Sequence, residues 1–356
     1  MFDTTIAVAP LDEALTFARV RVNDVTNLLS VTRYADGAVV GYNLTQEVDS
    51  NPTDPVDVFN DLGYEALKNR IESLSESSLV EYPLDQLSVP LELTDEHIAA
   101  GTNFAAHADE SSVEEGPFLF AKMVTPTPFN APVSVESGGL LDYEVELSYV
   151  TLDDTSLTEP PEYMGLILSN DFTNRAKLLR HLDPDNVVSG DGFTTGKSAP
   201  GFLPVGNLFV IPKNYREFSS SLTLELAVNE KLRQSGSMEL VIWDIDELFN
   251  QIFARKDTLW EYQDEQVGLP VVDGVIPPRT LIMAGTPDGT IFQGPTTKIM
   301  IKGVFRFLLG GWNQSIVENV IEHYISSAQR QGNFLSPGDS VHIRVENMGE
   351  INTQVQ

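Results

Sequence analysis

Residues 140–150 combine a strand-like alternation with closely spaced acidic side chains, so this stretch could support chemistry. In a β-strand, Glu144 and Glu146 would lie side by side on one face, opposite a face of apolar side chains. Neighbouring carboxylates repel each other, and burying them is costly unless a cation neutralises them. A third acid, Asp171, follows within residues 169–173. Three carboxylates would suit a hard cation such as Mg²⁺, Mn²⁺ or Ca²⁺.

A simpler interpretation of residues 140–150 stays open at this point. Strands of antiparallel sheets commonly turn one polar face to water. Glu144 and Glu146 could therefore line the solvated face of an ordinary strand, without any bound ion. The alternation alone does not separate a metal site from a wet strand.

The composition limits the partners of the chain. Its 356 residues include 52 acidic and 22 basic side chains, which gives a formal charge of −30. This charge argues against binding to nucleic acid or to an anionic membrane, because both need clustered Lys and Arg. A small anionic substrate would need a pocket in which a metal and local bases reverse the field. The chain has no cysteine, which excludes disulfides, thiolate metal sites and cysteine nucleophiles.

The sequence carries no targeting signal that we can identify. Its first residues lack a basic segment followed by an apolar one, as a signal peptide would have. No apolar run approaches the length of a membrane-spanning helix. We therefore expect a soluble, cytoplasmic protein.

The elements that must position the acids are mostly strands. Apolar side chains recur with helical spacing in three segments, which are residues 56–75, 244–254 and 314–329. Clean alternation predicts strands over residues 223–228 and 340–346. Short strand-like runs and the first helix indicate a small α+β unit over residues 1–92. Because the remainder, residues 93–356, is mostly strands with turn signals, we expect a β-rich α+β fold.

Eight short motifs follow one another along the second part of the chain. They are residues 101–110 (G-x-N-F-x-x-H-x-x-E), 118–122 (ending F-x-K), 142–147 (D-Y-E-x-E-L), 170–175 (N-D-x-T-x-R), 196–198 (G-K-S, with P-x-G at 204–206), 228–234 (V-N-x-x-x-R-Q), 285–287 (G-T-P) and 337–339 (P-G-D). Each motif is short, but their order is specific. From about residue 90 to the C-terminus, the chain resembles the fumarylacetoacetate hydrolase superfamily.

This resemblance implies a fold and a metal centre. The fold would be a mixed β-sandwich or roll over residues 93–356, preceded by the small N-terminal domain. Glu144, Glu146 and Asp171 would be the ligands of a divalent cation, with Mg²⁺ as the first candidate and Mn²⁺ or Ca²⁺ as alternatives. Members of the superfamily are usually dimeric, so a homodimer is expected.

The resemblance also implies roles for further side chains. His107 and Glu110, three residues apart on one helical face, would activate a water molecule, with Glu110 orienting the imidazole. Lys197 would stabilise the developing enolate oxygen. Lys122 would bind substrate as a second anion partner or bond the metal carboxylates, and Thr286 would contact substrate. The simpler alternatives are solvated surface lysines and, for Thr286, an ordinary turn.

The predicted activity is metal-dependent hydrolysis of a carbon–carbon bond in an acylpyruvate or another 1,3-diketo acid. A related lyase, which would decarboxylate an oxaloacetate-like acid or dehydrate a 2-keto-3-deoxy sugar acid, is the alternative. A catalytically silent binding protein on the same fold is a further one. The three ligands, the His–Glu pair and the lysine favour an enzyme, since a fold alone would not need them.

The chain departs from the family pattern in two respects. Ala176 stands where relatives commonly carry an acid after the arginine of N-D-x-[ST]-x-R, which should alter the choice of substrate or its affinity. Two insertions, near residues 254–272 and 292–334, lengthen the body. The second could be a lid, a dimer contact or extra packing. We expect an interface or packing role, because its apolar, amphipathic sequence must be covered.

Overall fold

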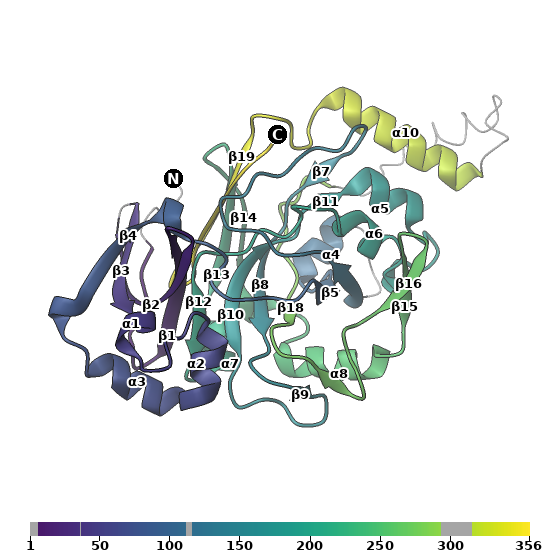
Figure 1. The fold of residues 1–356 in the computed structure, drawn as a ribbon. Coiled ribbons are helices and arrows are strands. Elements are labelled where there is room, and N and C mark those ends of the chain that lie inside the picture. Colours follow the sequence, from purple (N-terminus) through teal and green to yellow (C-terminus); the bar gives the residue numbers. More distant parts are fainter. Residues whose placement is uncertain (1–5, 36, 112–115, 293–314) are drawn as a thin grey trace.

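A long mixed β-sheet runs through the molecule and begins with the strands near the N-terminus (Figure 1). The computed structural model describes residues 6–35, 37–111, 116–292 and 315–356, with residues 35 and 109–111 described by backbone only. A second, antiparallel sheet packs on the first where β13 contacts β8 and β20 contacts β10. Sheets dominate and helices flank them, which confirms the predicted β-rich α+β class.

The large sheet has ten strands, and the smaller one has four. In spatial order the large sheet consists of β4 (Leu79–Pro83), β3 (Ala38–Asn43), β2 (Val25–Ala35), β1 (Ala14–Val22), β12 (Phe209–Pro212), β10 (Gly165–Asn170), β8 (Val145–Val150), β18 (Leu281–Met283), β5 (Glu96–Gly101) and β6 (Phe118–Met123). The smaller sheet consists of β14 (Lys231–Ser237), β13 (Thr223–Val228), β19 (Ser340–Val345) and β20 (Gly349–Gln354). The strands predicted over residues 223–228 and 340–346 are therefore confirmed.

Short strand pairs and helices complete the described part of the chain. The pairs are β7 (Leu141–Asp142) with β11 (Thr173–Asn174), β9 (Thr155–Ser156) with β17 (Val275–Ile276), and β15 (Leu259–Tyr262) with β16 (Glu265–Gly268). The helices are α1 (Leu44–Glu47), α2 (Pro55–Leu62), α3 (Tyr64–Glu72), α4 (Ala105–Ser111), α5 (Arg175–His181), α6 (Phe193–Lys197), α7 (Tyr215–Ser220), α8 (Ile245–Arg255) and α10 (Ile316–Gln331), with 3₁₀ turns at Glu76–Ser78, Leu84–Gln86, Val187–Ser189 and Met238–Leu240.

The helix predictions hold in two places and need a correction in the third. α8 and α10 confirm the helices expected near residues 244–254 and 314–329, although residue 314 lies outside the described part. The single helix expected over residues 56–75 is instead α2 followed by α3. Gly63 separates them with a φ of +75°, a conformation that ends a helix and that glycine adopts without steric cost.

The strand expected over residues 140–150 is also interrupted. β7 ends at Asp142 and β8 begins at Val145, so residues 143–144 carry irregular backbone. Every residue of β8 is buried, and Glu144 and Glu146 are only 4% and 1% exposed. The interpretation of this stretch as the wet face of an ordinary strand is therefore wrong.

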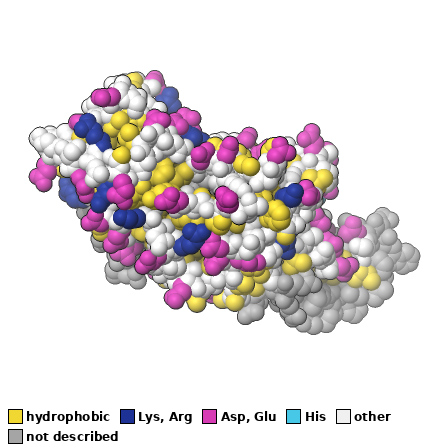
Figure 2. Space-filling view, turned by 90° about the horizontal axis from the view of Figure 1, so that it is seen from below, with side chains coloured by type: hydrophobic (Ala, Val, Ile, Leu, Met, Phe, Trp, Pro, Cys, Tyr) yellow, Lys and Arg dark blue, Asp and Glu magenta, His cyan; other side chains and the backbone are white. Residues whose placement is uncertain are grey.

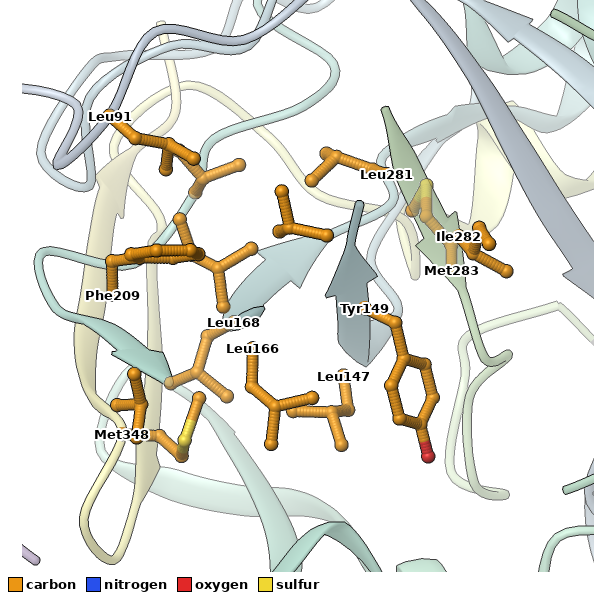
Figure 3. Close-up of a cluster of buried hydrophobic side chains, with 14 of the residues drawn as sticks. Leu91, Leu147, Tyr149, Leu166, Leu168, Phe209, Leu281, Ile282, Met283 and Met348 are labelled. Carbon is orange, nitrogen blue, oxygen red and sulfur yellow. The ribbon is translucent and has the colours of Figure 1, made fainter. Parts of the chain in front are cut away.

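The hydrophobic core lies along β8, β10 and β18. Figure 3 shows Leu147 and Tyr149 of β8 beside Leu166 and Leu168 of β10, and all four side chains are buried. Burial of an aliphatic side chain of this size stabilises the fold by about 1.5–3 kcal/mol. This core fixes β8 and β10 against each other, and the acidic residues lie at the ends of these two strands.

The first four strands continue the large sheet, since β1 pairs with β12 in antiparallel register. Asp54 adds a polar link between the N-terminal unit and the body. Its carboxylate accepts hydrogen bonds from the backbone N–H groups of Val56 (2.9 Å) and Glu92 (2.6 Å), and it forms an ion pair with Arg279 at 3.0 Å. The division into domains at residue 92 stays a prediction.

Acidic side chains are scattered over the face shown in Figure 2, with Lys and Arg among them. This distribution is what the formal charge of −30 leads one to expect. Within the described ranges, none of the helices combines the length and apolar character that crossing a membrane would require.

Candidate metal and substrate site

Three buried carboxylates meet where β8 and β10 lie side by side. The antiparallel register pairs Glu146 with Ser169, and it brings Asp171, just beyond β10, next to Glu144. The backbone N–H of Asp171 donates to the carbonyl oxygen of Glu144 at 2.9 Å. One carboxylate oxygen from each of Glu144, Glu146 and Asp171 lies within 4.8 Å of the others. The three predicted metal ligands are therefore brought together.

At the break between β7 and β8, two backbone N–H groups donate to side chains. The N–H of Glu144 donates to Oδ1 of Asn170 at 3.0 Å, and the N–H of Val145 donates to Oε1 of Gln234 at 3.0 Å. These two amides satisfy buried donors that a regular ladder would otherwise pair.

Two lysines bind the carboxylates directly. Nζ of Lys197 lies 2.6 Å from Oε2 of Glu144 and 2.9 Å from Oδ2 of Asp171. Nζ of Lys122 donates to Oδ1 of Asp171 and to the carbonyl oxygens of Lys197 (2.7 Å) and Phe202 (3.2 Å). Lys122 is 0% and Lys197 2% exposed. Neither is the solvated surface lysine of the simpler alternative.

Arg175, at the start of α5, supplies a third cation. Its Nε donates to Oδ2 of Asp142 at 2.9 Å, and its Nη2 donates to Oε1 of Glu144. At Glu144 burial opposes ionisation, but the charges of Lys197 and Arg175 outweigh it and lower the pKa of the carboxyl to about 2. Glu144 is thus held as a carboxylate.

Glu146 differs from the other two acids. Its Oε2 accepts a hydrogen bond from the backbone N–H of Gly285 at 3.1 Å, but no lysine or arginine of the described residues forms a salt bridge with it. Burial and the charges of Asp171 and Glu144 raise its pKa well above the usual range. A hard divalent cation fits this donor set, because it would neutralise the carboxylate that the lysines leave uncompensated.

Glu144 lies at the polar end of a cavity of about 700 Å³. The polar side chains that line the cavity are Thr102, His107, Glu144, Arg175, Lys197 and Thr286. The opposite end is apolar. It is formed by α5, the segment after it, and the first two turns of α10, including Leu178, Leu182, Val187, Val317, Val320 and Ile321. The cavity therefore joins a charged end to a hydrophobic end.

His107 and Thr286 both lie at this polar end. His107 belongs to α4 and is 5% exposed, close enough to Glu144 to help lower the pKa of that acid. The side chain of Glu110 lies outside the described part, so its predicted contact with His107 stays a prediction. The Thr286 hydroxyl accepts a hydrogen bond from Nε2 of Gln234 at 2.8 Å, which fixes it facing the cavity.

Comparison with known proteins identifies the family of the chain. The protein-family model described as "Fumarylacetoacetate (FAA) hydrolase C-terminal" matches residues 96–356, which is more than half of the chain. The chain belongs to the fumarylacetoacetate hydrolase family. A fumarylacetoacetate hydrolase from Exiguobacterium antarcticum has a similar structure, with a TM-score of 0.61 over 96% of this chain and 99% of that one, at 18% identity.

Curated relatives in the fumarylacetoacetate hydrolase family carry other activities in their names. "Oxaloacetate tautomerase FAHD2, mitochondrial" of Oryza sativa subsp. japonica is 31% identical over 202 residues, 53% of this chain and 84% of that protein. "Oxaloacetate tautomerase YisK" of Bacillus subtilis is 31% identical over 207 residues, 54% and 65% of the two chains. A bifunctional isomerase/decarboxylase of homoprotocatechuate catabolism from Escherichia coli is 26% identical over 219 residues, 59% and 45%.

Two residues within the motifs of the family have roles that the sequence analysis did not assign. Arg175 links Asp142 to Glu144, and Gln234 bonds Val145, Thr286 and the carbonyl oxygen of Pro287. Both side chains are buried, at 4% and 1% exposed. Arg175 ends the motif N-D-x-T-x-R and Gln234 ends the motif V-N-x-x-x-R-Q. These positions were the sequence signal that could have identified the two residues.

Lys122 lies behind the carboxylates rather than beside the substrate. It is absent from the described residues that line the cavity, and its ammonium group donates to Asp171 and to the backbone carbonyl oxygens of Lys197 and Phe202. Of the two roles considered for Lys122, its position favours bonding of the metal carboxylates over contact with substrate.

The two departures from the family pattern meet at α10. Ala176 is 1% exposed and packs in a small apolar cluster with residues of α5 and α10, including Leu179, Ile325 and Ala328. In Figure 1, α10 lies beside α5, and the two helices are in contact. The described part of the second insertion thus contributes packing and a cavity wall, while residues 293–314 lie outside it. The first insertion forms the end of α8 and the β15–β16 hairpin.

Proposed function

We propose that this protein is a divalent-metal-dependent hydrolase that cleaves the carbon–carbon bond of an acylpyruvate. The observation that carries the proposal is the presence of Glu144, Lys197 and His107 in one cavity wall. A carboxylate cluster for a cation, a buried ammonium and an imidazole are the groups that enolate chemistry requires. An enzyme is favoured over a silent binding protein because three buried cations and four buried acids are costly without a function.

A cation held by Glu144, Glu146 and Asp171 would supply Lewis-acid stabilisation of negative charge on the substrate oxygens. His107 accepts a proton from water, whose oxygen adds to the acyl carbonyl carbon. The bond between this carbon and the methylene carbon then breaks, and its electron pair passes to the pyruvate half. His107 returns the proton to the methylene carbon, so that a carboxylic acid and pyruvate are released.

The other side chains bind and orient. Lys197 places a buried positive charge beside the developing enolate oxygen, where the low dielectric strengthens its effect. Arg175 holds Glu144 in its carboxylate form and lines the cavity. The Thr286 hydroxyl, fixed by Gln234, can donate to a carboxylate oxygen of the substrate.

Oxaloacetate tautomerisation is a second candidate. Its support is that two relatives, each 31% identical to this chain, are named oxaloacetate tautomerases. In that reaction His107 would take the proton from the methylene carbon and return it to the enol oxygen, without adding water. Decarboxylation or dehydration of related keto acids would use the same site.

A substrate panel tests the proposal. The protein loaded with Mg²⁺ or Mn²⁺ is given acetylpyruvate, oxaloacetate and a 2-keto-3-deoxy sugar acid, and pyruvate, enol absorbance and carbon dioxide are followed. Release of pyruvate and acetate from acetylpyruvate in equal amounts is expected. Enol–keto conversion of oxaloacetate with no cleavage of acetylpyruvate would support the tautomerase instead. The homodimer, the cytoplasmic location and Mg²⁺ as the resident ion stay predictions.

A further inference from the structure

We infer that the substrate carries an extended apolar acyl group, which lies between α5 and the first two turns of α10. This inference rests on the proposed function, because it assumes that the keto-acid end of the ligand binds among His107, Lys197 and Thr286. The geometry that supports it is a single cavity that is lined both by these polar groups and by apolar side chains of α5 and α10.

The size of the cavity argues against a small dicarboxylate as the best ligand. Cavities of about 300–1,000 Å³ usually enclose molecules of drug size. The present cavity, at about 700 Å³, is much larger than acetylpyruvate or oxaloacetate needs. A small substrate would leave the wall of Leu178, Leu182 and Val320 in contact with water or empty space, which disfavours tight binding.

The charge distribution selects the chemistry of the far end. Among the described lining residues, the ionisable ones are His107, Glu144, Arg175 and Lys197, all at the polar end. A second carboxylate at the far end would lose its hydration without gaining a charged partner among the described lining residues. An alkyl or aryl group would instead gain by leaving water. The acyl group is therefore expected to end in hydrocarbon.

The apolar wall is anchored to the body. Ser315 and Glu318 form a capping box at the start of α10, and Arg180 of α5 forms an ion pair with Glu322 at 2.6 Å. Further along, Gln329 donates to the carbonyl oxygen of Gly138 at 2.7 Å. Ile316 and Val317, at the open end of this wall, are each 44% exposed. An acyl chain in the cavity would cover apolar surface that the protein itself leaves in water.

A homologous series tests the inference on the metal-loaded protein. Acetylpyruvate, butanoylpyruvate, hexanoylpyruvate and octanoylpyruvate are compared with succinylpyruvate, which matches butanoylpyruvate in length but ends in a carboxylate. Dissociation constants are measured by calorimetry, with His107→Ala where turnover interferes, and kcat/KM is measured alongside. The Kd should fall about threefold to fourfold for each added methylene until the cavity is filled. Succinylpyruvate should bind at least tenfold more weakly than butanoylpyruvate.

Val317→Asp tests the wall itself. An acidic side chain near a helix start is compatible with α10, so the variant should fold. It should abolish the gain in affinity that octanoylpyruvate has over acetylpyruvate. Val25→Asp, which adds the same charge at a 58% exposed position outside the cavity, should have no effect. Val317→Thr is a milder variant, because threonine is similar in shape to valine. It should weaken the binding of octanoylpyruvate by a smaller factor.

The outcomes separate this inference from the proposed function. Cleavage of acetylpyruvate with equal Kd values along the series would overturn the apolar acyl group and leave the hydrolase in place. Affinity that rises with length while no compound is cleaved would support the acyl group and remove the hydrolase. If Val317→Asp changes the oligomeric state and not the chain-length dependence, the wall is an interface and the inference is wrong.

Discussion

Nζ of Lys197 lies 2.6 Å from Oε2 of Glu144, and both side chains are buried at the polar end of the cavity. This contact places a buried positive charge beside a carboxylate that is predicted to bind a metal. A lysine so placed can stabilise the carboxylates before a metal binds, and it can stabilise substrate charge afterwards. In the first role the lysine competes with a metal for the carboxylates, whereas in the second role it acts together with a bound metal. Mutation of Lys197 separates the two roles.

Lys197→Met should therefore weaken catalysis without weakening the metal site. Loss of a preorganised charge at a developing oxyanion lowers kcat by about 10²–10³. The metal-free variant should also lose about 3–5 kcal/mol of stability, since breaking a buried ion pair leaves carboxylates unpaired. Added Mn²⁺ should restore more of the free energy of unfolding than it adds to the wild type. Denaturant unfolding with and without Mn²⁺ measures the two changes in stability, and steady-state kinetics measure kcat.

Lys213→Met is the matched control for that change. Lys213 pairs with Glu65 at 3.2 Å, and both side chains are more than half exposed. Its removal should change stability by about 1 kcal/mol or less and leave kcat unaltered. If Lys197→Met costs no more than this control, the buried contact has no energetic weight and the assignment of Lys197 fails.

The acidic site shows how far the sequence could predict the structure. Glu144, Glu146 and Asp171 were identifiable because their spacing along two segments and the family motifs agree. The break at residues 143–144 could not be predicted, because it depends on the side-chain oxygens of Asn170 and Gln234, which lie in other strands and accept hydrogen bonds there. A local alternation cannot report contacts that depend on tertiary register.

The cavity wall illustrates the same limit for packing. The helical spacing of residues 314–329 predicted α10, but its partner could not be read from that spacing. α10 packs on α5, far away in the sequence, partly through the small Ala176. Amphipathic sequence indicates that a face is covered, whereas the fold alone determines what covers it.

Glu146→Gln should weaken metal binding and leave the metal-free fold intact. Glu146 is the acid of the cluster without a salt bridge in the described residues, so a neutral amide of the same shape removes repulsion from Glu144 and Asp171. We expect a Kd for Mn²⁺ that rises by about 100-fold or more, together with unchanged or higher stability without metal. Calorimetric titration with Mn²⁺ measures the first, and thermal unfolding in EDTA the second.

Two results would contradict this view of Glu146. Full metal affinity in Glu146→Gln would remove Glu146 from the ligand set. A large loss of metal-free stability would indicate that its charge is compensated within the fold. Glu65→Gln, at an exposed site, provides the control for loss of one negative charge.

His97 should make the stability of the protein depend on pH. It is fully buried in β5, where burial and the charge of Lys122 lower its pKa to about 3. The unfolded chain binds this proton near pH 6.5 and the folded chain does not, so the contribution is complete above pH 6.5 and is lost as the pH falls toward 3. At pH 5 the loss should be about 2 kcal/mol relative to pH 7.

His97→Asn isolates that term from the many carboxylates. The asparagine Oδ1 can accept the hydrogen bond that Nδ1 of His97 receives from the N–H of Leu281 at 3.2 Å. Urea unfolding at pH 5 and pH 7 should show a pH-dependent loss that is smaller by about 2 kcal/mol in the variant. Equal losses in the two proteins would mean that His97 takes up a proton in the folded state.

His107→Ala should strongly reduce turnover and leave metal binding unchanged. His107 lines the polar end of the cavity and does not belong to the carboxylate cluster, so its loss removes a proton acceptor and no ligand. General-base catalysis contributes about 10²–10⁴ to the rate, and kcat for acetylpyruvate should fall by that factor. His181→Ala, which alters an exposed histidine at the end of α5, should keep full activity. The rate of oxaloacetate tautomerisation in the same variant then distinguishes the two candidate functions. If tautomerisation persists while cleavage of acetylpyruvate stops, His107 acts on water, as hydrolysis requires. If wild-type protein tautomerises oxaloacetate without cleaving acetylpyruvate, and the variant loses tautomerisation, His107 acts on carbon and the second candidate function is the correct one.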